Sequence, residues 1–246
     1  MIESNTVYFV GSGPGDPELI TIKAKKLLEN ADVIVYSGSL LNPKLLQYAK
    51  KDAVLHDAAL LDRNRIYEVL RDSTKQGKLA IRFHDGDPAL FSTIREQIDK
   101  LFLDGINCKV VPGITAILGA ASSLNLELTL PGITQTLIIT RAELRTPVPK
   151  RESISSLASH GATMAFYLSV HLIRNIVEEL LKGKTYHTST PAAVVYRATW
   201  EDENIIVGTL GNIVDKVKEA KITKTAIIIV GNVINPRGYE FSKVYD

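Results

Sequence analysis

Three short segments combine glycine, proline and aspartate directly after apolar runs. They are 11–17 (GSGPGDP), 84–88 (HDGDP) and 112–116 (PGITA). In α/β proteins, ligands bind at the loops that follow strands, and glycine lets a ligand approach the backbone closely. Acidic side chains without a metal favour a neutral or cationic ligand. Each segment is therefore a candidate ligand loop.

The first loop departs from the dinucleotide-binding fingerprint. In the pattern G-x-G-x-x-G the third glycine would fall at Asp16, whose carboxylate would repel a pyrophosphate. An alternative to ligand binding is that Asp16 caps a helix with Pro17 in its first turn, and that the glycines only permit a tight turn. Asp87 and Pro88 have the same alternative, and both remain open.

A protein-bound metal is not expected. His84 stands beside two aspartates, but a single histidine lacks the repeated ligand spacing of a metal site. The glycine and alanines at 119–121 favour helix packing, with close approach of a flat ligand as the alternative.

The first half of the chain alternates β-branched runs with longer amphipathic segments. Predicted strands lie at 6–10, 32–36, 53–56, 79–83 and 108–111. Predicted helical segments lie at 18–30, 43–50, 65–76, 89–102 and 114–124. Strands joined by helical crossovers predict an α/β domain with a mainly parallel sheet covered on both faces.

This alternation breaks at 125–135 (NLELTLPGITQ), which predicts a domain boundary and hence α/β domains at 1–124 and 125–246. Strands are expected near 136–140, 163–167, 192–196, 204–207 and 225–230. The short polar connection TWEDE predicts an antiparallel hairpin. The second sheet should therefore be mixed.

Composition excludes several classes of protein. With 29 basic and 27 acidic residues among 246, the net charge of +2 provides no strong field for nucleic acid or an anionic membrane. The apolar runs are too short or too interrupted to cross a bilayer. The single cysteine, Cys108, cannot form an internal disulfide, and the first residues lack a signal-peptide pattern, so a cytoplasmic location is expected.

The segments GSGPGDPELIT, HDGDPALF and VPGITA, in this order and each after a predicted strand, resemble the tetrapyrrole methylase family. TRAELRTPVPK, ASHGATMAFYLS, AAVVYRATWEDE and TAIIIVGNV continue the resemblance over nearly the whole chain. Within the family, the stretch 141–149 with HGATM and FYLS is most similar to members that methylate carbon 11 of a precorrin during cobalamin biosynthesis.

This resemblance implies a homodimeric enzyme that binds S-adenosylmethionine between its two domains and methylates a tetrapyrrole, here a precorrin. By matching the family's motifs, the resemblance also implies a set of cofactor-binding residues in both halves of the chain: Pro14, Asp85, Gly86, Asp87, Leu90, Thr115, Ala116, Leu168, Ala198, Thr225 and Ala226.

The resemblance does not identify a general base in this chain. Related uroporphyrinogen methylases have an acidic residue just after the second strand, where this chain has Ser37. Glu143 is a candidate for a polar catalytic or substrate-binding role, with a solvated loop glutamate as the alternative. Arg141 and Arg145 are candidates for binding substrate carboxylates, because planar guanidinium groups pair with them, and solvent-exposed charge is the alternative. Trp200 could cover a flat ring or pack a hairpin or dimer surface.

Three questions stay open at this point. The reaction could occur at another ring carbon of a precorrin or uroporphyrinogen, since the cofactor motifs are shared. The substrate could contain cobalt or be metal-free. A non-catalytic nucleotide-binding module is the distant alternative, and it would bind nucleotide without methyl turnover.

Overall fold

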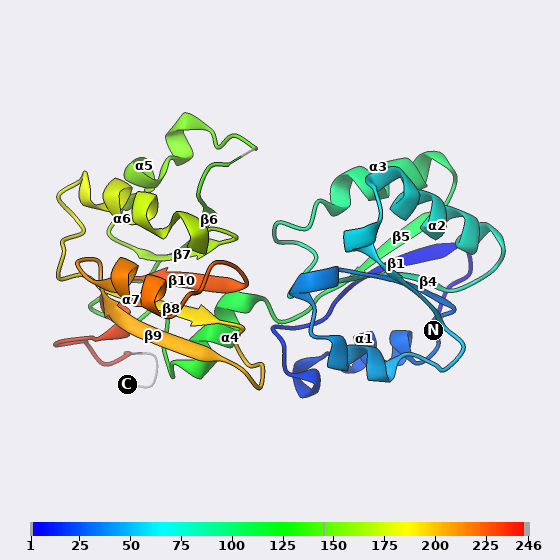
Figure 1. The fold of residues 1–246 in the computed structure, drawn as a ribbon, viewed down its shortest axis with the longest axis horizontal. Helices are drawn as coiled ribbons and strands as arrows, with labels where there is room; N and C mark the ends of the chain where they lie inside the picture. The colour runs from blue at the N-terminus through cyan, green and yellow to red at the C-terminus, as the bar shows by residue number, and fades with distance from the viewer. Residues whose placement is uncertain (1, 145, 244–246) are drawn as a thin grey trace. The chain divides into compact units, whose positions relative to one another are not determined.

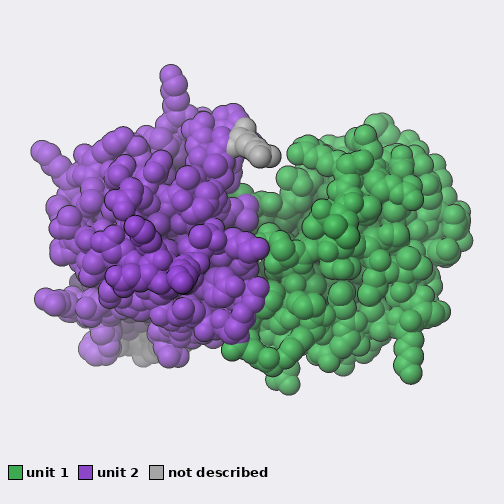
Figure 2. Space-filling model, in the orientation of Figure 1, with its two compact units in different colours: residues 1–118, 199–201 green, residues 119–198, 202–246 purple. Residues whose placement is uncertain are grey.

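The computed structural model describes residues 2–144 and 146–243, so the predicted substrate residue Arg145 lies outside the described residues. The chain forms two compact units, coloured separately in Figure 2. Unit 1 comprises 1–118 with 199–201, and unit 2 comprises 119–198 with 202–246. The division falls inside helix α4 (Ala116–Ser123). The predicted domain boundary after residue 124 stays a prediction.

Unit 1 contains a parallel sheet with the strand order β3-β2-β4-β1-β5. Its strands are β1 (Thr6–Gly11), β2 (Val33–Tyr36), β3 (Val54–Asp57), β4 (Ala80–His84) and β5 (Asn107–Val111). The prediction of a mainly parallel first sheet is confirmed. Gly11 pairs with His84, so the ends of β1 and β4 meet at the same edge of the sheet.

Helices cover both faces of this sheet. They are α1 (Ile22–Leu28), α2 (Arg63–Lys75) and α3 (Ile94–Leu103), with the 3-10 helices η1 (Pro17–Leu19), η2 (Gly38–Leu40), η3 (Pro43–Tyr48) and η4 (Ala58–Leu60). Tyr8 and Val10 of β1 share a buried cluster with α1, whereas Val7 and Phe9 share one with α2 and α3. This alternation follows from the two-residue period of a strand, and Figure 1 shows α1 on the opposite side of the sheet from α2 and α3.

Three predicted helical segments differ from expectation. The segment predicted at 18–30 is divided into η1 and α1. Residues 43–48 form a 3-10 helix, and the segment predicted at 89–102 becomes helical only at Ile94. The Asp87 side chain accepts the Ala89 N–H, which makes a local turn. Phe91 and Thr93 then adopt left-handed φ values of 55° and 51°. These left-handed residues interrupt the helical backbone, so α3 begins only after Thr93.

Unit 2 contains a second sheet with the order β6-β7-β10-β8-β9. Its strands are β6 (Leu137–Arg141), β7 (Thr163–Tyr167), β8 (Pro191–Tyr196), β9 (Asn204–Thr209) and β10 (Ala226–Val230). β6 and β7 are parallel and the other pairs are antiparallel, which confirms the predicted mixed sheet. Tyr196 pairs with Asn204, which confirms the predicted hairpin around TWEDE.

The helices of unit 2 are α5 (Ile154–Ala158), α6 (Ile173–Leu181) and α7 (Ile213–Glu219), with 3-10 helices η5 (Lys150–Glu152), η6 (Val170–Leu172) and η7 (Asn232–Ile234). Ile176 of α6 and Ile213 of α7 join the buried cluster that contains Phe166, Val194 and Ile228 of the sheet. Within residues 2–144 and 146–243, no helix has the length and apolar character needed to cross a membrane.

Candidate ligand site

The three glycine-containing loops of unit 1 meet at the carboxyl edge of its sheet. Gly13 and Gly86 form an antiparallel bridge, with N–O distances of 3.2 and 3.0 Å. A Cβ on Gly113 would lie 2.2 Å from the Gly86 carbonyl oxygen, and one on Gly11 would lie 2.6 Å from the same atom. Backbone approach this close requires glycine. The loops therefore form one continuous backbone surface.

Asp87 ties the second loop to the third. Its Oδ1 accepts the Ala89 N–H at 2.7 Å, and its Oδ2 accepts the Gly113 N–H at 2.9 Å. Asp16 makes a simpler contact, since one carboxylate oxygen accepts the Glu18 N–H at 2.8 Å. Capping is thus confirmed for Asp16 at a 3-10 helix, and for Asp87 at a turn rather than a helix.

The remaining predicted cofactor residues of unit 1 surround this surface. The Thr115 Cα and the Ala116 nitrogen each lie 3.7 Å from the position of a Cβ on Gly86. The Leu90 N–H donates to the Asp87 carbonyl at 3.2 Å. The structure therefore gathers these residues around one edge, as a shared ligand site requires.

Asp85 belongs to a network with Ser37 and Arg82. Arg82 is 7% exposed, and its Nη1 donates to the carbonyls of Val35 and Phe83 at 3.1 and 3.2 Å and to Ser37 Oγ at 3.4 Å. The Ser37 hydroxyl hydrogen-bonds the Asp85 carboxyl. Burial lowers the pKa of Arg82 to about 10 and raises the pKa of Asp85. Ser37 has no carboxyl group of its own, but its hydroxyl holds the carboxyl group of Asp85 beside it.

Replacing Asp85 with asparagine should raise the free energy of unfolding at neutral pH. Burial raises the folded-state pKa of Asp85, so the charged carboxylate is less stable in the folded chain than in the unfolded chain. This unfavourable contribution is complete above the folded-state pKa and disappears as the pH falls below the unfolded pKa. Denaturant unfolding across this pH range should show the gain at neutral pH and its loss in acid.

A gain that does not change with pH, or a loss of stability at neutral pH, would contradict this electrostatic account of Asp85. Asp99, which is exposed and paired with Arg95 on the surface of α3, provides a comparison. Asp99→Asn should change the free energy of unfolding by less than about 0.5 kcal/mol at any pH, as is usual for a surface pair.

His84 is buried at 2% exposure, and burial together with Arg82 holds its pKa well below the usual value. The imidazole is therefore neutral at neutral pH. Among the described residues, no three histidine, cysteine, aspartate or glutamate side chains are grouped to hold a metal ion. The expectation that the protein binds no metal stays a prediction.

The predicted cofactor residues of unit 2 share one edge of its sheet. β10 runs antiparallel to β7 and β8, so its first residue, Ala226, lies beside the last residues of those two strands. Leu168 directly follows β7, and Ala198 lies two residues after the end of β8. Leu168 and Thr225 have left-handed φ values of 53° and 54°. Such values in non-glycine residues cost energy and concentrate at functional sites. The four predicted residues are therefore brought to the same edge.

Arg141 and Glu143 line a pocket of about 530 Å³ in unit 2, together with Lys150, Glu152 and Glu179 among others. Acidic and basic groups are mixed there, so the pocket is not simply an anion site. The Arg141 guanidinium donates to the carbonyls of Ala142, Thr146 and Pro147 at 3.2, 3.0 and 3.3 Å. Arg141 thus organises its own loop, and its contact with substrate stays a prediction.

The role of the segment 199–201, which belongs to compact unit 1, was not evident from the amino-acid sequence. Trp200 Nε1 donates to the Pro14 carbonyl at 3.2 Å, and the Asp16 N–H donates to Thr199 Oγ1 at 3.0 Å. The polar connection TWEDE, with the only tryptophan of the chain, was the available signal. Nothing in its local pattern identified Pro14 as the partner.

The charges of the three loops define which ligand fits. Segments 11–17, 85–91 and 112–116 contain three aspartates and no lysine or arginine. A phosphate would find no basic side chain in these loops, whereas a sulfonium cation with a polar adenosyl group suits their acidic side chains and close-packed backbone. The residues present therefore fit S-adenosylmethionine.

Several known proteins are similar to this chain over most of its length. Residues 6–214 match the family described as Tetrapyrrole (Corrin/Porphyrin) Methylases. A cobalt-precorrin-4 C(11)-methyltransferase of Methanocaldococcus jannaschii is 50% identical over 246 residues, covering 100% of this chain and 95% of the relative. A precorrin-4 C(11)-methyltransferase of Pseudomonas aeruginosa is 44% identical over 240 residues, covering 98% and 95%.

Two solved structures share the fold. A cobalt precorrin-4 methyltransferase of cobalamin biosynthesis superposes with a TM-score of 0.91 at 39% identity, covering 94% of this chain and 97% of the other. Uroporphyrin-III C-methyltransferase from Thermus thermophilus, complexed with S-adenosylhomocysteine, gives 0.78 at 27% identity, covering 93% and 98%. The three joined loops and the two sheets are consistent with these matches. Because the family model and the relatives match nearly the whole chain, the chain belongs to the tetrapyrrole (corrin/porphyrin) methylase family.

Proposed function

We propose that this chain transfers a methyl group from S-adenosylmethionine to carbon 11 of precorrin-4 or cobalt-precorrin-4 in cobalamin biosynthesis. The observation that carries the proposal is the convergence of Gly11, Gly86 and Gly113 into one acidic, backbone-lined surface. The full-length similarity to two carbon-11 methyltransferases, at 50% and 44% identity, supports the choice of ring carbon.

The cofactor site of this proposal has two parts. In unit 1 it comprises Pro14, the loop from Asp85 to Leu90, Thr115 and Ala116, and in unit 2 it comprises Leu168, Ala198, Thr225 and Ala226. The expectation that the cofactor lies between two domains, with a boundary after residue 124, belongs to the same proposal. So do a homodimer, a cytoplasmic location, and substrate contacts from Arg141, Arg145 and Glu143.

When bound, S-adenosylmethionine supplies a methyl group made electrophilic by its sulfonium. The protein then has to hold that methyl close to the acceptor carbon, and positioning of this kind can remove several kcal/mol, on the order of 7 to 11, from a barrier. Asp87 fixes two of the three loops to each other through its carboxylate. Asp85 places negative charge at the same edge, where it favours a cationic ligand.

The main alternative is methylation of another ring carbon of a precorrin or uroporphyrinogen. The fold is shared with a uroporphyrin-III methyltransferase, so the fold alone does not distinguish the two reactions. Two features favour the precorrin: the higher identity to the carbon-11 enzymes, and Ser37 at the position where the family resemblance implies an acidic residue in uroporphyrinogen enzymes. A non-catalytic nucleotide-binding module would bind the cofactor but would not transfer its methyl group.

A turnover assay separates these functions. The purified chain would be incubated with methyl-labelled S-adenosylmethionine and, separately, cobalt-precorrin-4, metal-free precorrin-4 or uroporphyrinogen III. We expect label in one or both precorrin-4 forms and little in uroporphyrinogen III, with the faster form identifying the natural substrate. Transfer to uroporphyrinogen III alone would support the alternative, and cofactor binding without transfer to any of the three would contradict a methyltransferase of this group.

A further inference from the structure

We propose that the connection between β8 and β9 holds the first cofactor loop in its binding conformation through Trp200 and Thr199, and so sets the affinity for S-adenosylmethionine. This inference rests on the proposed function, because it assumes that the loop around Pro14 contacts that cofactor. It assigns Trp200 a positioning role that acts through the loop backbone.

The loop's backbone is held by side chains from two segments distant in sequence. The Pro14 carbonyl accepts from Trp200 Nε1 at 3.2 Å, and the Asp16 N–H donates to Thr199 Oγ1 at 3.0 Å. Between them, the Gly15 carbonyl accepts from Asn42 Nδ2 at 2.9 Å. Three consecutive residues of the loop are thus each fixed through a backbone polar group.

Such fixing matters because this loop is rich in glycine. Gly13 has a φ of 83°, and Gly11, Gly13 and Gly15 leave the unbound backbone many conformations. Hydrogen bonds that hold one conformation before binding reduce the entropy that the ligand must remove, which increases affinity without adding a ligand contact. Trp200 and Thr199 supply two of these bonds.

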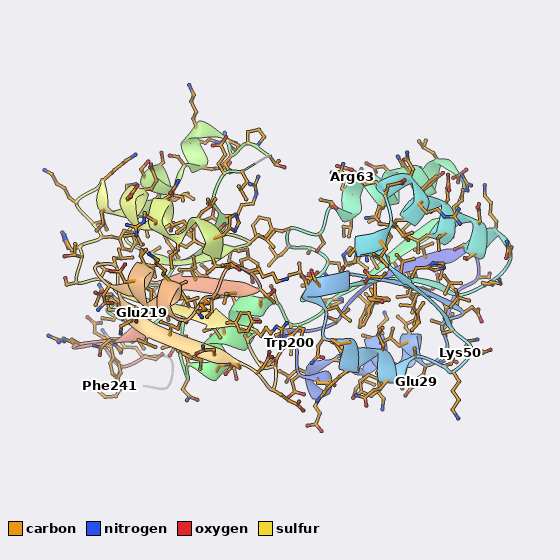
Figure 3. The ribbon with its side chains drawn as sticks, in the orientation of Figure 1. Glu29, Lys50, Arg63, Trp200, Glu219 and Phe241 are labelled. Atoms are coloured by element: carbon orange, nitrogen blue, oxygen red, sulfur yellow. The ribbon has the colours of Figure 1, made fainter. Side chains whose placement is uncertain are left out.

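The backbone of the connection is itself unusual. Arg197 and Thr199 have left-handed φ values of 48° and 68°, on either side of Ala198, a predicted cofactor residue. The Arg197 N–H also donates to the Thr225 carbonyl at 2.9 Å. Conformations of this kind persist only when surrounding contacts determine them. Trp200, labelled in Figure 3, follows this turn and donates its indole N–H to the Pro14 carbonyl.

The indole hydrogen bond adds a positioning role to those considered for Trp200. It links the connection to the Pro14 carbonyl, whether or not the ring also covers a ligand or packs against a hairpin or dimer surface. The adjacent Glu201 forms an ion pair with Lys44, but that pair is exposed and contributes little energy. The indole and the Thr199 hydroxyl are therefore the groups to test.

Trp200→Phe tests the inference, because phenylalanine keeps an aromatic ring and removes the N–H donor. Calorimetric titration of the full-length protein with S-adenosylhomocysteine should give a Kd about three- to tenfold higher, the effect of one lost hydrogen bond. KM for S-adenosylmethionine should rise similarly, while kcat at saturating cofactor stays within about twofold of wild type, as loss of loop pre-organisation without loss of a transition-state contact predicts. Thr199→Val should weaken binding to a comparable degree.

Lys44→Met provides the matched control. It removes the exposed ion pair to the neighbouring Glu201 and should change the Kd by less than about twofold.

The outcomes separate this inference from the proposed function. If the wild-type protein does not bind S-adenosylhomocysteine, the proposed function fails as well. If wild type binds but both Trp200→Phe and Thr199→Val keep its affinity, the positioning role alone is wrong. A lower melting temperature with an unchanged Kd would assign these residues to stability, and would also contradict the inference.

Discussion

Replacing Gly113 with alanine should abolish measurable binding of S-adenosylmethionine and strongly destabilise the protein. The new Cβ would lie 2.2 Å from the Gly86 carbonyl oxygen and 3.0 Å from the Gly11 Cα. Both are backbone atoms of other loops, so no side chain can move aside. We expect a loss of more than about 3 kcal/mol in the free energy of unfolding, above the usual range for overpacking. Urea unfolding and calorimetric titration measure the two effects.

Gly183→Ala is the matched control for this substitution. Nothing lies closer to a Cβ at that position than the Thr185 nitrogen at 4.0 Å, and Gly183 does not have a left-handed φ. Its stability and ligand affinity should stay close to wild type. A Gly113→Ala protein that folds normally and binds S-adenosylhomocysteine as wild type does would show that the three loops are not joined as described.

Asp87→Asn should weaken cofactor binding about tenfold or more and lower the free energy of unfolding by about 1.5 to 3 kcal/mol. Both carboxylate oxygens of Asp87 accept backbone N–H groups, from Ala89 and Gly113. Asparagine has one acceptor oxygen, so its amide NH₂ would face the second N–H donor. The link between two cofactor loops would then be lost. The same titration and unfolding measurements test this prediction.

Asp16→Asn distinguishes the loss of a link from a general loss of charge. Asp16 makes one capping bond, to the Glu18 N–H, and asparagine caps about as well as aspartate. The two substitutions remove the same charge from neighbouring loops. Equal effects would contradict the linking role of Asp87, whereas a large effect at Asp87 with a small one at Asp16 would support it.

The architecture and the cofactor loops could be predicted because their signals are local. Each strand of unit 1 is a short run rich in β-branched and other apolar residues, and three of these runs are followed directly by the glycine-containing loops. The order of motifs then indicated the family. The hairpin of unit 2 was predictable for the same reason, since TWEDE is a short polar connection between two β-branched segments.

The contacts among these elements could not be read from the sequence. Trp200 and Pro14 lie 186 residues apart, and nothing near either residue specifies the other. The same holds for Arg82 and Ser37, which meet only because β4 pairs with β2. The late start of α3 follows from the left-handed backbone of Phe91 and Thr93, which the helical periodicity of the segment does not indicate.

Location of the transferred methyl group tests the central claim most directly. The protein would be given S-adenosylmethionine carrying a ¹³C methyl group and the form of precorrin-4 on which it acts, and the product would be analysed by NMR. We predict one new labelled methyl, bonded to carbon 11 of the macrocycle. A labelled methyl on any other ring carbon would contradict the proposed reaction, although the chain would remain a tetrapyrrole methylase.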